Sequence, residues 1–520
     1  MHHPFALNRC VPALAALGEA RETGVADFGD YDAVGLAELV RRGDATAREL
    51  VDWSIGQIEA LDGTLNAVVW RRFEQARIEA ERVRPQSSPL AGVPFLLKDY
   101  GAEVAGEPLQ LGSRFWQGYR PSVDAELTRR FRAAGLIVLG RTNVPELAIL
   151  GHTTPTLYGP CRNPWNPQRT AGGSSGGAAA AVAARMVPVA HASDGGGSIR
   201  IPASACGLVG LKPTRARVPF GPQRGEGWGG LAGAFAVSRT VRDTAALFDA
   251  VAGPARGDPY WAPPLEQPLT EAVQADAKGL RVAVFRGSFF GTGVDPECVA
   301  AVEDAAQLCR ELGHEVREAS PNFDRSEAVR AYLTLVAAGV AAAVDARAKE
   351  LGRGPRADEL ELSTWIMNLM GQKLSALDLA RARETMHRLG RTLAEFHQDH
   401  DVLLSATMAQ PPRPLEALRF SWRERVQMQL LKSVGTPRLF AVAMEALAES
   451  SFEPTPNTQL FNLSGQPAVN VPLHWGAQGL PIGVQFAGRF GDEATLLQLA
   501  AQLEQARSWH ARRPAVAASN

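Results

Sequence analysis

Hydrophobic positions along this chain switch between helical spacing and short continuous runs. After Thr46, apolar residues recur at helical spacing, and threonine is a residue type that caps helix N-termini. The face expected to be buried on that helix consists of Leu50, Val51, Ser54, Ile58 and Leu61. Similar patterns predict helices over residues 124–134, 242–251, 296–312, 328–351 and 492–506, and strands over 136–139, 281–285, 401–404, 468–471 and 484–486. Alternating helices and strands are typical of a sheet covered by helices.

Other segments lack such a period. Residues 218–232 are rich in glycine, residues 255–274 are rich in proline and are predicted to form a surface connection, and residues 508–520 are predicted to be a loose tail. No internal repeat is visible in the sequence.

Composition agrees with a large globular protein. The chain has 520 residues, of which 45% are hydrophobic and 21% charged, and its net charge is −1. By length alone, a chain of this size corresponds to about three domains of ~150 residues. The near-zero net charge gives no electrostatic reason to expect nucleic acid or an anionic membrane as a partner.

Cysteine and histidine usage excludes further classes of protein. The five cysteines are odd in number and lack C-x-x-C spacing, which indicates scattered thiols of a reducing compartment. The ten histidines show no metal-binding pairing, so no metal is expected. No stretch approaches the ~18 apolar residues of a membrane span, and residues 11–17 are too short for the core of a secretory signal. We therefore expect a cytoplasmic protein.

The candidate chemistry lies in two loops that combine serine with dense glycine. They are Ala171-Gly-Gly-Ser-Ser-Gly-Gly-Ala178 and Ser193-Asp-Gly-Gly-Gly-Ser-Ile-Arg200. Glycine lets a backbone turn sharply and bring its amides close to a ligand. A serine beside several inward-pointing amides is what an oxyanion hole requires.

A lysine upstream supplies a candidate base. Lys98 ends an apolar run that predicts a buried strand, and burial disfavours the ammonium form and lowers its pKa. Asp99 could keep that lysine charged, but strand alternation places neighbouring side chains on opposite faces. Serines and a lysine together can build a hydrolase nucleophile without histidine.

Each of these features has an ordinary structural explanation. A Gly-Gly-Ser-Ser-Gly-Gly segment alone is more often a flexible linker. Residues 225–230 fit the G-x-G-x-x-G string, but prolines precede it where a strand should be, so no dinucleotide cofactor is expected. Cys206 is expected to be a small core residue rather than a catalytic thiol. Arg200 is predicted to pair internally and fix the second loop.

At these residues the sequence resembles the amidase signature hydrolases. The resemblance covers residues 31–514, and within the family it is strongest to the branch that contains 6-aminohexanoate-cyclic-dimer hydrolases. That narrower similarity rests on residues 191–194 and 198–204. The matching motifs cover residues 92–99, 163–166, 172–177, 194–202, 206–214, 461–468 and 479–485.

The resemblance implies one α/β/α domain around a large mixed twisted sheet covered by helices. It would span residues 31–510, with an N-terminal extension at 1–30 and a C-terminal tail at 511–520. It also implies that Ser198 is the nucleophile, that Ser174 bridges after a cis peptide bond, and that Lys98 is the base. No cofactor is implied, and homodimers are common in the family.

The family pattern also assigns supporting roles. The oxyanion would be held by backbone amides of Gly195, Gly196, Gly197 and Ser198, with support from Ser175, Asp194 and Arg200. One departure is Gly195, because many members carry Thr or Ile there, although a backbone donor survives that change. Pocket walls are expected from residues 147–158, 218–232 and 328–351.

Several functions follow as hypotheses. The first is a stand-alone amidase acting through a Ser-Ser-Lys triad and an acyl-enzyme on a fairly apolar linear or cyclic amide. The alternative is the amidase-type glutaminase subunit of a tRNA-dependent amidotransferase, although such subunits usually carry Gln where this chain has Ile201. A phosphate or nucleotide binder using the glycine loops is the third, and no Walker lysine–serine pair supports it.

Overall fold

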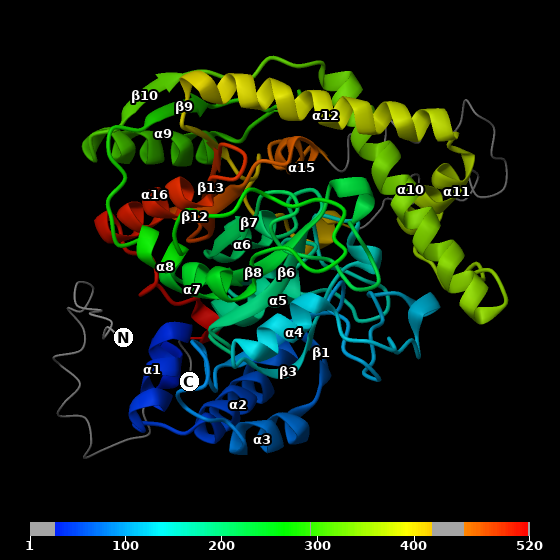
Figure 1. Ribbon diagram of the computed structural model, residues 1–520, viewed down its shortest axis with the longest axis vertical. Helices are drawn as coiled ribbons and strands as arrows, with labels where there is room; N and C mark the ends of the chain where they lie inside the picture. The colour runs from blue at the N-terminus through cyan, green and yellow to red at the C-terminus, as the bar shows by residue number, and fades with distance from the viewer. Residues whose placement is uncertain (1–26, 292, 419–451, 518–520) are drawn as a thin grey trace.

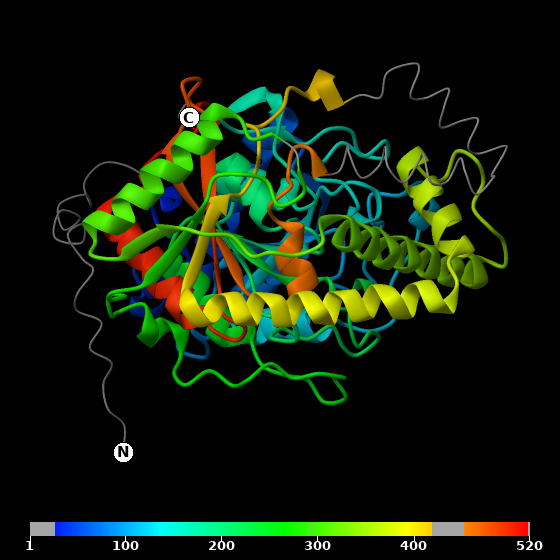
Figure 2. The same ribbon diagram turned by 90° about the horizontal axis from the view of Figure 1, so that it is seen from above.

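A mixed sheet of 11 strands forms the centre of the computed structural model, which describes residues 27–291, 293–418 and 452–517. The strand order is β1-β3-β2-β6-β8-β7-β12-β13-β11-β9-β10. Helices flank this sheet (Figures 1 and 2). This is the α/β arrangement that the alternating pattern predicts, because each apolar sheet face needs a helix layer to exclude water.

The elements have the following bounds. The strands of the main sheet are β1 (Val68–Arg71), β2 (Pro94–Lys98), β3 (Ile137–Thr142), β6 (Val189–Asp194), β7 (Val209–Lys212), β8 (Gly233–Ser238), β9 (Arg281–Phe285), β10 (Glu315–Glu318), β11 (Val402–Ala406), β12 (Ala468–Trp475) and β13 (Pro481–Gly488), and a small separate sheet pairs β4 (Arg162–Asn163) with β5 (Asn166–Thr170). The helices are α1 (Ala33–Arg42), α2 (Ala47–Leu65), α3 (Phe73–Glu81), α4 (Glu126–Ala133), α5 (Gly176–Ala183), α6 (Arg200–Cys206), α7 (Val241–Val251), α8 (Leu269–Ala272), α9 (Pro296–Glu311), α10 (Arg325–Leu351), α11 (Leu362–Lys373), α12 (Ala376–Asp399), α15 (Gln459–Ser464) and α16 (Glu493–Ala506). Short 3₁₀ turns are η1 (Phe28–Asp30), η2 (Arg114–Trp116), η3 (Glu146–Ala148), η4 (Trp228–Gly230), η5 (Leu415–Leu418) and η6 (Ala515–Ala517).

The sheet brings two strands far apart in sequence side by side. Strand β2 runs parallel to β3 on one side and to β6 on the other, with Phe95 opposite Val189 and Leu96 opposite Ala190. The carboxyl ends of parallel strands meet at one sheet edge, where open α/β sheets commonly carry their sites. Lys98 and the Ser193–Asp194 pair therefore emerge together.

The predicted elements are present with shifted ends. Thr46 caps α2 through a capping box with Glu49, and the five positions expected to be buried on that helix are buried. Strand β3 continues to Thr142, beyond the predicted end at residue 139, and β12 continues to Trp475. Strand ends shift because pairing depends on the neighbouring strand as well as on the strand's own apolar pattern.

Helices α10, α11 and the beginning of α12 lie beyond one side of the sheet (Figures 1 and 2). They pack through a second apolar cluster that also contains Ala283, Leu403, Ala468 and Ala487 from the strands. Among the described residues, α10 is the helix long and apolar enough to cross a membrane by length and composition, with a mean hydropathy of 1.5. This corrects the expectation that no stretch approaches that length. Half of the apolar window is buried inside the protein.

The segment after α16 is not a loose tail as far as residue 517. Trp509 is only 3% exposed, and its indole N–H donates to the Arg239 carbonyl at 2.9 Å. The Arg512 guanidinium lies 4.2 Å from the centre of the Trp475 ring. Burial of this large aromatic side chain holds the segment against the protein, although most residues around it are polar.

This C-terminal segment meets the first described residues. Arg513 forms an ion pair with Asp27 at 3.2 Å. Arg185 donates to the Gly29 carbonyl at 2.6 Å and to the His510 carbonyl at 2.9 Å. The two ends of the described chain therefore lie next to each other.

Candidate active site

Lys98 is held at the end of a buried strand. All five residues of β2 are buried, and the Lys98 backbone N–H donates to His191 Nδ1 at 3.2 Å. Its Nζ lies 2.7 Å from Ser174 Oγ and 2.9 Å from Ser193 Oγ. The strand thus fixes the amine against two hydroxyl groups.

Burial governs the protonation of this amine. Complete burial lowers the pKa of Lys98 to about 7, and the negative charge of Asp194 acts in the opposite direction. Asp99 faces elsewhere, as strand alternation predicts. Its carboxylate accepts hydrogen bonds from the Gln110 and Gly112 amides and from the Tyr158 hydroxyl. A large fraction of Lys98 is therefore neutral near pH 7.

The first glycine–serine loop presents Ser174 to the lysine. The Gly173–Ser174 peptide bond is cis, as the family resemblance implies. Helix α5 follows directly, is buried along its whole length, and packs against β2, β3, β6 and β8. Its small side chains let it approach closely, because a Cβ at Gly177 would lie 2.3 Å from the Asn143 nitrogen.

Hydrogen bonds of Ser175 join the two loops. The Ser175 N–H donates to the Ser198 carbonyl at 3.3 Å. The Ser175 hydroxyl donates to the Ser193 carbonyl and accepts from the Ser193 N–H, both at 3.3 Å. Ser198, which is half-buried, is thereby held beside the Ser174–Ser175 pair.

A buried ion pair fixes the second loop. Arg200 donates to both carboxylate oxygens of Asp194, at 2.9 and 3.0 Å, and neither side chain is exposed. Asn462 donates to the same carboxylate at 2.9 Å. The Arg200 and Asn462 contacts hold the pKa of Asp194 well below its usual range, despite burial. Arg200 therefore pairs internally, as predicted.

One expected oxyanion donor is already engaged. The Gly197 N–H donates to Asp194 Oδ1 at 2.6 Å, so it points into the protein rather than toward a ligand. This correction leaves the amides of Gly195, Gly196 and Ser198 as the candidate donors. The reason is the Asp194 carboxylate, which accepts a hydrogen bond from the amide three residues ahead, at the spacing of an N-cap side chain and its N3 amide.

The segments expected to form the pocket walls lie against the two loops. A Cβ at Gly195 would lie 2.6 Å from the Trp228 ring, and one at Gly196 would lie 2.0 Å from the Tyr332 hydroxyl. A Cβ at Gly173 would lie 2.5 Å from the backbone nitrogen of residue 152. Each predicted wall segment thus contributes a residue at the loops.

Sequence reasoning missed several residues that complete the site. Ser193 was not assigned a role, although its hydroxyl lies 2.9 Å from Lys98 Nζ. Thr458 donates to the Gly196 carbonyl at 2.7 Å, and Asn462 supports Asp194. For Thr458 and Asn462, at and within helix α15, the available signal was a polar residue among buried apolar ones, since buried polar groups need partners.

Other candidates do not form sites. Residues 225–230 contain only the short turn η4, with no strand before it and no α-helix opening after it. Cys206 is buried and burial raises the pKa of its thiol. Within residues 27–291, 293–418 and 452–517 no cluster of metal-ligating side chains occurs.

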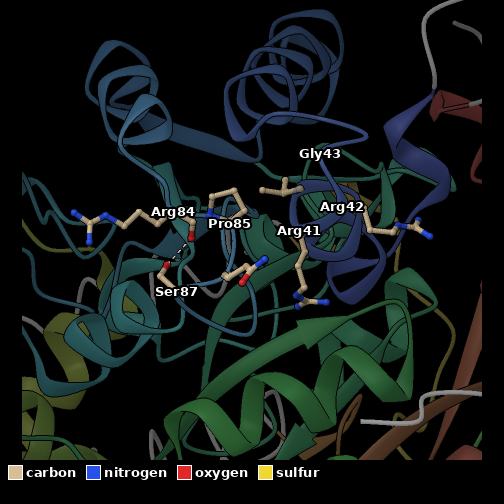
Figure 3. Close-up of a pocket in the computed structure, with 8 residues that line it drawn as sticks. Arg41, Arg42, Gly43, Arg84, Pro85 and Ser87 are labelled. Atoms are coloured by element: carbon tan, nitrogen blue, oxygen red, sulfur yellow. Dashed lines mark hydrogen bonds between the residues drawn. The ribbon is translucent and has the colours of Figure 1, made fainter. Parts of the chain in front are cut away.

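A surface hollow of about 540 Å³ lies elsewhere, between the end of α1 and the segment after α3 (Figure 3). Its lining includes Arg41, Arg42 and Arg84. Arg41 and Arg42 form ion pairs with Glu38 on their own helix. None of the lining residues belongs to the Lys98 site.

Known proteins resemble this chain in sequence and in fold along nearly their whole length. The Amidase family model matches residues 49–497. The 6-aminohexanoate-cyclic-dimer hydrolase of Pseudomonas sp. (strain NK87) is 37% identical over 491 residues, which cover 93% of this chain and 96% of the relative.

Solved structures are similar to this chain in fold. A 6-aminohexanoate cyclic dimer hydrolase complexed with substrate superposes with a TM-score of 0.87 at 36% identity, covering 94% of this chain and 99% of that one. A bacterial aryl acylamidase of the amidase signature enzymes family gives 0.82 at 27% identity, with coverage of 94% and 99%. With its glycine–serine loops and buried lysine on that fold, the chain belongs to the amidase signature family of hydrolases.

Proposed function

We propose that this protein hydrolyses a carboxamide C–N bond through an acyl-enzyme on Ser198, with Ser174 and Lys98 as the proton relay. The observation that carries the proposal is the 2.7 Å separation between Lys98 Nζ and Ser174 Oγ in a fully buried setting. An amide is a poor electrophile with a poor leaving group, so it needs an activated nucleophile and a proton donor to nitrogen.

Acylation uses the relay in both directions. Neutral Lys98 takes the Ser174 proton while Ser174 takes that of Ser198, and the Ser198 oxygen bonds to the carbonyl carbon. The negative oxygen that forms faces the amides of Gly195, Gly196 and Ser198. When the C–N bond breaks, the proton returns through Ser174 to the amine that leaves.

Deacylation repeats the sequence with water. Water gives its proton to the relay and attacks the ester carbon, and the bond to Ser198 breaks as that oxygen regains a proton. Ser193 keeps the lysine amine oriented throughout, because its hydroxyl lies 2.9 Å from Nζ. The carboxylic acid is then released and the relay is restored.

An apolar amide suits the residues around the loops. Ile201 is 2% exposed, and its Cδ1 lies 2.7 Å from where a Cβ on Gly197 would sit. A similar protein is a hydrolase of the 6-aminohexanoate cyclic dimer, which supports a linear or cyclic aliphatic amide. The glutaminase alternative is disfavoured, because a polar side chain would be expected at residue 201.

Replacement of the nucleophile tests the proposal. Ser198→Ala removes one oxygen from a half-buried position, so the fold should persist while amide hydrolysis falls ~10³-fold or more. A serine-directed fluorophosphonate should add mass to the Ser198 peptide of the wild-type protein only. Ser87→Ala makes the same change at a remote serine and should keep full activity.

The outcomes separate the alternatives. A folded Ser198→Ala protein that retains most of its activity contradicts the assignment of the nucleophile. Efficient release of ammonia from glutamine, with no hydrolysis of aliphatic, cyclic or aryl amides, would favour the glutaminase function. Colorimetric ammonia release and a panel of amides of graded length provide both readouts.

A further inference from the structure

Trp228 is enclosed between two glycines from distant parts of the chain. A Cβ at Gly195 would lie 2.6 Å from Cε3 and Cζ3 of its indole, on the six-membered ring. A Cβ at Gly339 would lie 2.5 Å from Cδ1, on the five-membered ring. Real Cβ atoms do not approach other atoms so closely, so the indole occupies space that only glycine at both positions leaves open.

The backbone at this residue is held in an unusual conformation. Trp228 has φ +49°, in the left-handed region that a bulky side chain rarely adopts. Such a conformation persists only where its surroundings impose it, and it is typical of functional sites. The neighbouring Gly229 is equally confined, since a Cβ there would lie 2.9 Å from Leu335 Cδ2.

One face of α10 supplies these contacts. Tyr332, Leu335 and Gly339 are spaced by three and four residues, so they share one side of the helix. Tyr332 approaches Gly196, and Gly339 receives the Trp228 indole. The indole and the helix therefore border two successive glycines, Gly195 and Gly196, of the loop that contains Ser198.

Trp228 also reaches Tyr100, a residue near the base. Its side chain is within hydrogen-bonding reach of the Tyr100 hydroxyl, and the Tyr100 ring centre lies 5.9 Å from Lys98 Nζ. Trp228 is itself only partly buried, and its six-membered ring lies against Gly195. A substrate group placed next to the Gly195 amide would therefore contact the indole.

We propose that Trp228 is a specificity-determining residue, whose indole limits the size of the substrate group that fits beside the oxyanion loop. This inference rests on the proposed amide hydrolysis at Ser198. The glycines at 195 and 339 form a slot that fixes the ring, so the limit is set by a rigid wall. A smaller residue at 228 would open that space to a larger acyl or amine group.

Substrate preference provides the test. Trp228→Ala should raise the ratio of kcat/KM for a bulky amide to that for a short one about tenfold or more, in an acyl series or an amine series, because even one methylene in an apolar pocket changes kcat/KM by about that factor. Trp228→Phe keeps a smaller ring and should shift the ratio less, in the same direction. Trp261→Ala is the matched control, since Trp261 is 70% exposed, and should leave the ratio unchanged.

Coupling between residues 195 and 228 tests the contact itself. Gly195→Ala alone should lower Tm and kcat/KM, whereas in the Trp228→Ala background the same change should cost little, a coupling that a double-mutant cycle measures. An equal loss for every amide in Trp228→Ala, or additive effects in the cycle, would overturn the inference. If the wild-type protein hydrolyses no amide, the proposed function fails instead, and the Tm cycle still decides whether the slot exists.

Discussion

At the scale of single residues, position matters more than burial. Lys98 and Lys212 are both buried, and burial lowers the pKa of each amine to about 7. Lys212 Nζ donates to the Pro213 carbonyl at 2.7 Å, and a carbonyl has no proton for the amine to accept. Lys98 instead faces the Ser174 hydroxyl, which has one. A neutral amine becomes a base only where an acidic proton is within reach.

The pH dependence of activity should follow Lys98. Since the neutral amine is required, kcat/KM should rise with pH through about 7 and then reach a plateau. Lys98→Arg should be nearly inactive at every pH from 5 to about 9, because guanidinium keeps its proton in this range. Lys212→Met should keep the rising limb. Substantial activity in Lys98→Arg would show that positive charge, and not proton transfer, is the useful property.

The same shift in the Lys98 pKa should also make stability rise with pH. The folded pKa of Lys98, about 7, lies below the ordinary value of 10.5, so between these pH values the unfolded chain binds more protons. Stability from this group therefore rises with pH across that window. Lys98→Met should raise Tm most at pH 7 and below, with the gain shrinking toward pH 10. Calorimetric scans across this range would reveal a constant or growing gain if the amine were charged in the folded state.

Some roles at this scale could not be predicted from the sequence. The glycine–serine loops and Lys98 are local motifs, so Lys98, Ser174 and Ser198 could be proposed from their surroundings and the family resemblance. Ser193 contacts Lys98 only because β2 and β6 pair in parallel, across more than 90 positions of sequence. Gly197 was misjudged for a local reason, because the Asp194 carboxylate accepts a hydrogen bond from its amide.

At the scale of elements, amphipathic helices were the most predictable. Helix α2 has both its apolar face and its Thr46–Glu49 capping box in the sequence. Helix α12 carries a comparable capping box, Ser375 with Asp378, and was still not predicted, although charged residues are interspersed among the apolar ones along it. The all-small helix α5 has no amphipathic pattern, and its place against four strands is decided by close approach of the backbones.

Glycines in two helices should respond oppositely to alanine. Gly177→Ala should destabilise the protein by about 1–3 kcal/mol, because its Cβ would meet the Asn143 backbone in a packed region. Gly56→Ala in α2 should stabilise it by about 0.5–1 kcal/mol, since nothing lies within 4 Å of that position. Urea unfolding measures both changes, and a tolerated Gly177→Ala would mean that α5 is free to move away from the sheet.

At the scale of the whole molecule, the proposed reacting groups and the residues expected to form the pocket walls come from different parts of the fold. Lys98, Ser174 and Ser198 lie on or beside β2, α5 and β6, whereas the walls come from η4 and α10. The strand segments are fully buried and paired on both sides, so they tolerate little change. We therefore expect substitutions in η4 and α10 to disturb the proposed relay less than substitutions in these strands.

Removal of metal ions should not change turnover. Every proposed role is filled by side chains or backbone amides of this chain, so prolonged treatment with a strong chelator should leave kcat and KM unchanged. Activity before and after dialysis against the chelator is the measurement. A loss that added zinc restores would point to a metal-dependent step that the proposed relay lacks.

The contact between Asp27 and Arg513 has a topological consequence. Because the described ends adjoin, a short linker could join them and new ends could be opened near the exposed Trp261. In such a circular permutant α10 would be synthesised before β2 and β6, yet every strand would keep its neighbours. Such a permutant would change the order in which the strands are synthesised without changing which strands pair in the sheet.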